Sequence, residues 1–90
     1  MGPDKIQALV QEDRKLHVGD TVVAHWNNNG YYFHSRGKVT RLTTRKVQVR
    51  LLETPGNAEK TRKGEVIELP RITDFERWSS QTCVRRLGSR

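Results

Sequence analysis

The chain has 90 residues, of which 33% are hydrophobic and 30% are charged, a composition that suits one small domain. A domain of this size buries too little surface to enclose a large catalytic cavity, so we expect neither an enzyme nor a bound cofactor. Its 17 Lys and Arg against 10 Asp and Glu give a net charge of +7, which favours polyanionic partners such as nucleic acid, acidic protein surfaces or anionic lipid heads.

The single cysteine, Cys83, cannot form an internal disulfide, and a reducing, intracellular setting is the simplest interpretation of that count. The residue itself is expected to be buried as a small apolar side chain. No apolar run is long enough to cross a bilayer, so we expect no membrane partner. No Gly-rich phosphate loop and no arrangement of Ser, His and acid is recognisable, which again argues against catalysis.

Residues 1–15 predict a short helix or arm. The stretch "PDKIQALVQEDRKL" opens with Pro and Asp, which favour a helix start, and then spaces apolar residues for one helical face. A helix of about three turns is marginal alone, so it must dock on the domain or fray. The domain itself is expected over residues 16–87, with residues 88–90 as a tail.

Two alternating strands follow the arm. "VGDTVVAHW" predicts a strand that places Val22, Ala24 and Trp26 on one face. "NNNG" stops it, because Asn-Gly accepts the positive φ angles of a tight hairpin, and "YYFHSRGKVTRL" returns as a long second strand. Gly37 is expected to bend that strand or to mark a β-bulge, a common device for curling a small sheet.

The hairpin turn leaves two registers open. If the turn is Asn-Gly alone, Trp26 faces Phe33 and His25 faces His34; if it is the whole of "NNNG", Trp26 faces Tyr31. In the first case Trp26 and Phe33 share a face near the turn and form either the wall of a shallow aromatic pocket or a plug of the core. Two imidazoles with no clear third ligand do not make a metal site, so we expect none.

The rest of the chain predicts three further strands. "RKVQVRLL" alternates between an inward and an outward set, respectively Val47, Val49, Leu51 and Lys46, Gln48, Arg50. "ETPGNAEKTRK" is a polar loop, "GEVIELP" is a fourth strand ended by Pro70, "ITDFERW" is a short helical turn and "TCVRRL" is a fifth strand. The expected fold is mainly β, a small five-stranded antiparallel barrel with a short N-terminal helix.

The stretch "GDTVVAHWNNNGYYFHSRGKV" resembles the start of Tudor-type SH3-like barrels. In those barrels a Gly-Asp enters the first strand, a small residue precedes a Trp, and a short polar turn leads to an aromatic residue on the second strand. The resemblance covers roughly residues 18–69 and implies an SH3-like (Tudor-like) barrel.

The resemblance also implies a candidate binding pocket. In Tudor domains that read methylated lysine or arginine, four aromatic residues form a cage around the cation, and Trp26 and Phe33 match the first two positions. Tyr31 lies beside them. The other two positions fall in "LLETPGN", which has no aromatic residue, and Asn57 matches a polar residue that accompanies the cage. The chain therefore offers half of such a cage.

A basic stretch is the other informative feature. The segment from position 36 to position 50 contains no Asp or Glu. It contains six basic residues, namely Arg36, Lys38, Arg41, Arg45, Lys46 and Arg50. Arg85 and Arg86 lie in another acid-free segment, which a fifth strand would bring beside the sheet. A continuous cationic surface binds phosphates by releasing counterions, while nearby rings stack on unpaired bases. We therefore expect these residues to bind nucleic acid, RNA or DNA.

Three alternatives stay open at this point. The basic run is also typical of a solvated sheet face that keeps the protein soluble. The aromatic residues fit a peptide reader, with or without methylation of the peptide. The same cations would serve a structural subunit that docks on an acidic protein partner.

Overall fold

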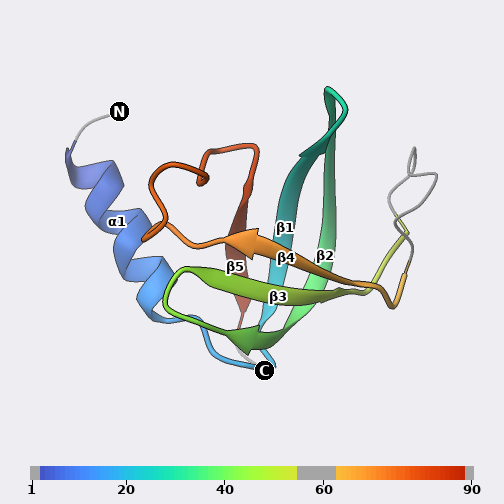
Figure 1. The fold of residues 1–90 in the computed structure, drawn as a ribbon. Coiled ribbons are helices and arrows are strands. Elements are labelled where there is room, and N and C mark those ends of the chain that lie inside the picture. The colour runs from blue at the N-terminus through green and yellow to red at the C-terminus, as the bar shows by residue number, and fades with distance from the viewer. Residues whose placement is uncertain (1–2, 55–62, 89–90) are drawn as a thin grey trace.

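The computed structural model describes residues 3–54 and 63–88 (Figure 1). One helix, α1 (Pro3–Arg14), precedes five strands: β1 (Thr21–Asn28), β2 (Tyr31–Leu42), β3 (Lys46–Leu51), β4 (Val66–Pro70) and β5 (Cys83–Gly88). These strands form one antiparallel sheet in the order β4-β3-β2-β1-β5. A mainly β fold with five antiparallel strands and one short N-terminal helix is thus confirmed.

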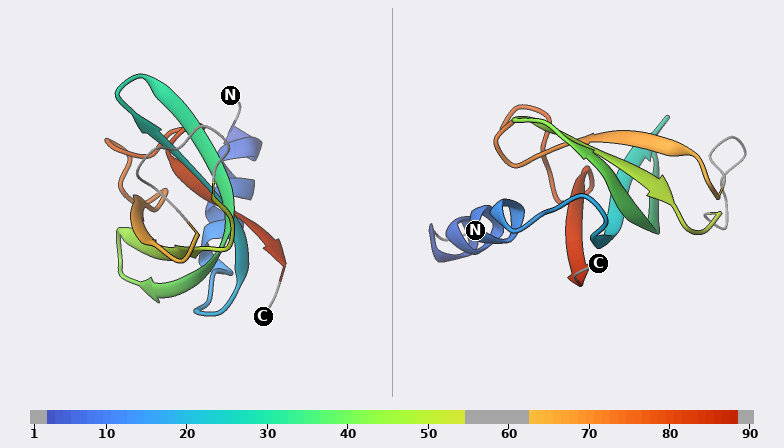
Figure 2. Two further views of the ribbon diagram at one scale, coloured as in Figure 1. Left: turned by 90° about the vertical axis from the view of Figure 1, so that its right-hand side faces the viewer. Right: turned by 90° about the horizontal axis from the view of Figure 1, so that it is seen from below.

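The sheet is open and strongly curved. Its two edge strands are β4 and β5, and in Figures 1 and 2 β3 and β4 cross over β5 at a steep angle. The 12-residue strand β2 is shared between two neighbours, because residues 31–38 pair with β1 and residues 37–42 pair with β3. No helix in the described ranges is long and apolar enough to cross a membrane.

The β1–β2 hairpin closes through the two-residue turn Asn29-Gly30. Both residues have positive φ, 53° and 83°, as a type I′ turn requires, and Trp26 pairs with Phe33. The centroids of these two rings lie 5.7 Å apart in a stacked arrangement. The shorter turn is therefore confirmed, and the four-residue alternative that would pair Trp26 with Tyr31 is wrong.

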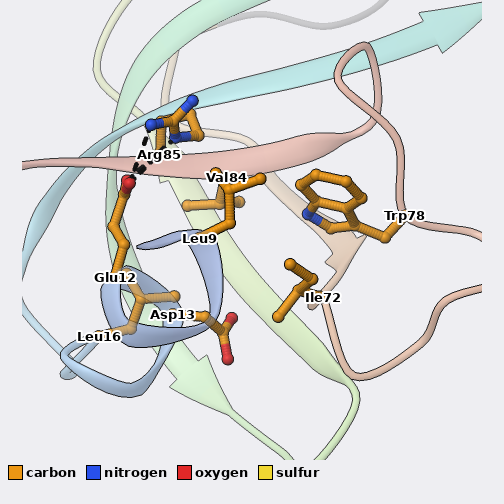
Figure 3. A pocket seen from close by; sticks show the side chains of 8 residues that line it. All are labelled: Leu9, Glu12, Asp13, Leu16, Ile72, Trp78, Val84 and Arg85. Atoms are coloured by element: carbon orange, nitrogen blue, oxygen red, sulfur yellow. Dashed lines mark hydrogen bonds and ion pairs between the residues drawn. The ribbon is translucent and has the colours of Figure 1, made fainter. Parts of the chain in front are cut away.

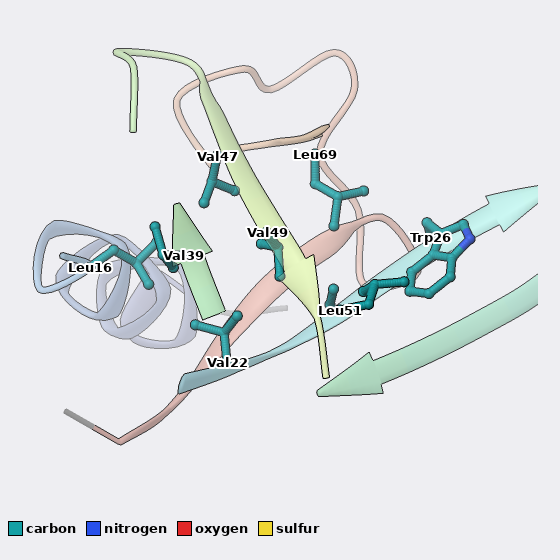
Figure 4. Close-up of a cluster of buried hydrophobic side chains, with 9 residues drawn as sticks. Leu16, Val22, Trp26, Val39, Val47, Val49, Leu51 and Leu69 are labelled. Atoms are coloured by element: carbon teal, nitrogen blue, oxygen red, sulfur yellow. The ribbon is translucent and has the colours of Figure 1, made fainter. Parts of the chain in front are cut away.

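The core lies on the concave face of the sheet (Figure 4). Alternation places one residue in two on this face, and the buried cluster comprises Leu16, Val22, Ala24, Trp26, Val39, Val47, Val49, Leu51 and Leu69. In Figure 4, Leu16 and Trp26 lie toward opposite ends of this cluster. The inward set predicted for the third strand is confirmed, since Val47, Val49 and Leu51 are all 1% exposed or less.

Gly37 does not mark a β-bulge, contrary to one of the two roles predicted for it. It pairs regularly with Val22 on β1 and with Leu51 on β3, and the register shift of β2 lies at Thr40 instead. A Cβ atom on Gly37 would come within 2.3 Å of Cγ1 of Val49 and 2.9 Å of a β3 carbonyl oxygen. The glycine is needed because β3 packs closely against it, a role that strand patterning alone does not reveal.

Helix α1 docks beside β5 through apolar contacts flanked by ion pairs (Figure 3). Leu9 faces Trp78 and Val84 across a small hollow, which is also lined by Glu12, Asp13, Leu16, Ile72 and Arg85. Asp13 pairs with Arg71 at 3.0 Å, and both side chains are mostly buried. The short helix is thus held by tertiary contacts, as its length demands.

The segment between β4 and β5 turns back across the end of the sheet. The segment "ITDFERW", where a short helical turn was expected, forms a series of turns. In one of them the backbone N–H of Trp78 donates to the backbone carbonyl of Asp74 at 2.9 Å. The Thr73 hydroxyl donates to the Thr44 carbonyl at 2.6 Å and ties this segment to the β2–β3 connection. A bridge between Ser79 and Thr82 then leads into β5.

Candidate functional site

The convex face of the sheet, here called the outer face, carries most of the basic side chains of the five strands. Alternation along β2 places four successive even-numbered residues on it, Tyr32, His34, Arg36 and Lys38. On β3, Arg50 lies opposite Lys38, and beyond the bulge Arg41 lies opposite Gln48. The bulge at Thr40 therefore keeps Arg41 on the same face as Lys38.

Three cations of the outer face form what we call the basic strip: Lys38, Arg41 and Arg50. All three are exposed, and none forms an ion pair with a residue that the structure describes. Lys38 and Arg50 are direct cross-strand partners, an arrangement in which like charges repel and destabilise a sheet. An anion bound between them would relieve that repulsion.

Two further predicted cations carry acidic neighbours. Nε of Arg36 donates to Glu53 at 2.7 Å, and Nζ of Lys46 lies 3.3 Å from Glu68. Hydrogen bonds from these cations lower the pKa of both carboxyl groups. Because the pairs are exposed to solvent, each contributes little to stability, and a phosphate can compete for the cation. Arg45 is exposed in the connection between β2 and β3.

The two arginines of β5 fasten the N-terminal segment. Arg85 makes a two-nitrogen contact with Glu12 at 2.9 to 3.2 Å, and the backbone N–H of Arg86 also donates to Glu12. Burial alone would raise the pKa of Glu12, but these hydrogen bonds outweigh it and lower the pKa. Arg86 is half-buried and donates to the Asp20 carboxylate, which is 2% exposed. The predicted binding residue Arg86 is thus held by a buried carboxylate, and its role on a binding surface stays a prediction.

An aromatic cluster, here called the ring cluster, lies on the outer face at the hairpin end of the basic strip: His25, Tyr32 and His34. Ring centroids are 5.9 Å apart for His25–Tyr32 and Tyr32–His34, and 6.2 Å apart for the two histidines. The Tyr32 hydroxyl is hydrogen-bonded to Nδ1 of His25.

His25 is also faced from β5, where Cys83 is its cross-strand partner and Arg85 lies nearby. Partial burial, followed by the positive charges of His34 and Arg85, lowers the pKa of His25. Burial raises the pKa of the Cys83 thiol, as its predicted place in the interior implies. No group of three His, Cys, Asp or Glu side chains suited to a metal ion occurs in residues 3–54 and 63–88.

Of the residues predicted for the aromatic pocket, Trp26 and Phe33 lie adjacent across the hairpin. Trp26 is 8% exposed and belongs to the core, and Phe33 is half-buried against it, so the interpretation of these rings as a core plug is confirmed. Tyr31 is on the same side of the hairpin but is 65% exposed near the turn. Asn57 lies outside the described residues.

The ring cluster was not predicted from the sequence, because Trp26 and Phe33 were interpreted as the aromatic site and His25 and His34 were considered only as metal ligands. The signal was present, since the Asn-Gly turn places His25 opposite His34, and alternation then puts Tyr32 on the same face. These residues continue directly into Arg36 and Lys38 along β2. One face of one strand thus carries rings at one end and cations at the other.

Fold and surface together define a small antiparallel β-sheet domain with a basic outer face. Residues 14–84 match a family described as a domain of unknown function (DUF7205), and because this match spans most of the chain, the chain belongs to that family. Comparisons with curated proteins and with solved structures found no significant match.

Proposed function

We propose that this domain is a non-enzymatic nucleic-acid-binding module and that its outer face is the binding surface. The observation that carries the proposal is the basic strip, in which Lys38 and Arg50 are adjacent like charges without an acidic partner in the described chain. Repulsion between them destabilises the sheet of the free protein, and a phosphate placed between them removes that repulsion. The net charge of +7 favours the approach of a polyanion from any direction.

The arrangement of rings favours this proposal over a reader of methylated side chains. A cage needs open aromatic faces around the cation, whereas Trp26 is buried and stacked on Phe33. Leu51, at the end of β3, is buried in the core, and an aliphatic side chain offers no π face there. The rings that are exposed beside the cations belong to the outer face instead.

We further propose that the curved sheet is an SH3-like barrel of the Tudor-like kind. The support is the bent β2, shared by two neighbours, and the contact between the edge strands β4 and β5, which brings the ends of the sheet together. In such a barrel the concave face is the core and the outer face of the first three strands is free to bind. This matches the placement of the basic strip.

The salt dependence of binding tests the proposal. Each phosphate neutralised contributes about 0.7 to 0.9 to the slope of log affinity against log salt, so replacing both Lys38 and Arg50 with Gln should flatten the slope by about 1.4 to 1.8. Fluorescence anisotropy with labelled oligonucleotides at several salt concentrations measures this. Sequence preference should change little, because the two cations act on phosphates.

A matched control removes two cations elsewhere. Arg14 and Lys15 are exposed at the end of α1, outside the sheet, and replacing both with Gln changes the net charge by the same amount. We expect this variant to keep nearly the native slope. Equal flattening in both variants, or no binding by the native chain at low salt, would favour docking of the basic face on an acidic protein.

A further inference from the structure

The ring cluster extends the basic strip toward the tip of the hairpin with side chains that carry no fixed positive charge. We propose that His25, Tyr32 and His34 form a stacking site for an unpaired base and that the polymer bound by the outer face is single-stranded. This inference rests on the proposed function and names its substrate class. It commits to one ligand chemistry, a flat heteroaromatic ring attached to a phosphodiester backbone.

The geometry of Tyr32 is the first support. Its ring lies within 16° of parallel to the ring of His25, and its hydroxyl is hydrogen-bonded to the same imidazole. The orientation of the tyrosine is therefore held before any ligand arrives, while 41% of the residue stays exposed. Preorganised rings lose little conformational entropy on binding, which favours affinity.

The second support is the exposure of the two rings that β2 contributes to the cluster. Tyr32 and His34 are both exposed, although they stand on the strand whose other face forms part of the core. The β1–β2 hairpin extends beyond β3 and β4 (Figure 1). The segment before β5 reaches its β1 side, where the Asn27 amide donates to the Gln81 side chain at 3.2 Å, while Tyr32 and His34 on the β2 side stay exposed. Aromatic rings that keep such exposure are suited to stacking on a base.

The third support is the continuity of rings and cations along one strand. From Tyr32 to Lys38 the outward residues of β2 span about 20 Å, at about 3.3 Å per residue. A single strand lying along β2 would place a base on the rings and its following phosphates beside Arg36, Lys38 and Arg50. In a duplex the base faces are already stacked on one another, so the ring cluster would have nothing to contact.

The test compares an oligo(dT) of about 12 nucleotides, within the site sizes known for single-strand binders, with the duplex it forms with oligo(dA). Anisotropy at fixed low salt should show tighter binding of the single strand. Tyr32→Ala should weaken that binding about 5- to 150-fold, the range that corresponds to about 1–3 kcal/mol per stacked base. Tyr32→Phe should keep most of it, because the ring remains.

Tyr31→Ala is the matched control, because Tyr31 is the adjacent and more exposed tyrosine but faces the other side of the hairpin. It should bind the single strand like the native chain. Should Tyr32→Ala unfold, as judged by circular dichroism, His34→Ala takes its place.

The outcomes separate this inference from the proposed function. Absence of binding to either probe would overturn both. Equal binding of strand and duplex, with no loss in Tyr32→Ala, would leave a phosphate-binding face and overturn the stacking site. Equal losses in Tyr31→Ala and Tyr32→Ala would also overturn it, because the effect would not belong to the outer face.

Discussion

Replacing Gly37 with alanine should destabilise the domain, although the residue lies in a strand where alanine is normally the better choice. The new Cβ would lie 2.3 Å from Cγ1 of Val49 and 2.9 Å from the carbonyl oxygen of Arg50. Carbon atoms in contact prefer about 3.5 to 4.0 Å, so one of the two strands must move by about 1 Å. Val49 is fully buried and β-branched, and its methyl group cannot rotate away without striking other core atoms.

The expected loss is about 2 kcal/mol. Overpacking of a dense core costs about 1–3 kcal/mol, and the upper end applies here because a backbone atom is among the obstacles. The lower entropy of the unfolded alanine chain offsets up to about 1 kcal/mol of that cost. For a domain of this size, the difference lowers the melting temperature by about 8–16 °C.

Urea denaturation followed by tryptophan fluorescence measures this loss, and a double-mutant cycle tests its cause. Val49→Ala removes the closest methyl group, so the losses of Gly37→Ala and Val49→Ala should not add in the double variant. A loss below about 0.5 kcal/mol in Gly37→Ala, or strict additivity in the cycle, would refute the steric explanation.

Two further predictions concern charged and titratable groups. Arg71→Met should cost about 3 kcal/mol by thermal denaturation, because it leaves the mostly buried carboxylate of Asp13 without the cation that binds it at 3.0 Å; a loss below about 1 kcal/mol would contradict this. Burial and the charges of His34 and Arg85 lower the pKa of His25 from its ordinary value of 6.5, so the unfolded chain binds the proton more readily. The contribution of neutral His25 to the free energy of unfolding should be complete above about pH 6.5 and should fall as the pH drops toward the lowered pKa. His25→Gln should flatten that part of a profile of urea midpoints against pH. Identical profiles would show that His25 is not the group responsible.

Local patterns predicted those parts of the fold that depend on local physics. Alternation in "RKVQVRLL" assigned the buried and exposed sides of β3 correctly, because a strand has period two whatever its partner. Asn29-Gly30 specified the turn, and with it the pairing of Trp26 with Phe33, because few other dipeptides accept two positive φ angles.

Features that depend on distant parts of the chain were beyond local patterns. The close approach of Val49 to Gly37 and the bulge at Thr40 both depend on how β3 lies on β2. The pairing of Arg85 with Glu12 joins residues 73 positions apart, so a run of basic residues did not reveal which of its members were already engaged. The candidate site changed for the same reason: Lys38 and Arg50 are adjacent only once the register is known.

The strand order also has a consequence for how the chain folds. Strands β1 to β4 are sequential neighbours in the sheet, whereas β5 must return across the whole meander to pair with β1. The bond between Arg86 and Asp20 spans 66 positions, and contacts of such separation form late because a long loop must be closed first. We infer that the meander β1–β4 assembles as an early unit, and that the arrival of β5, which also carries one of the ion pairs that hold α1, is the event that completes the domain.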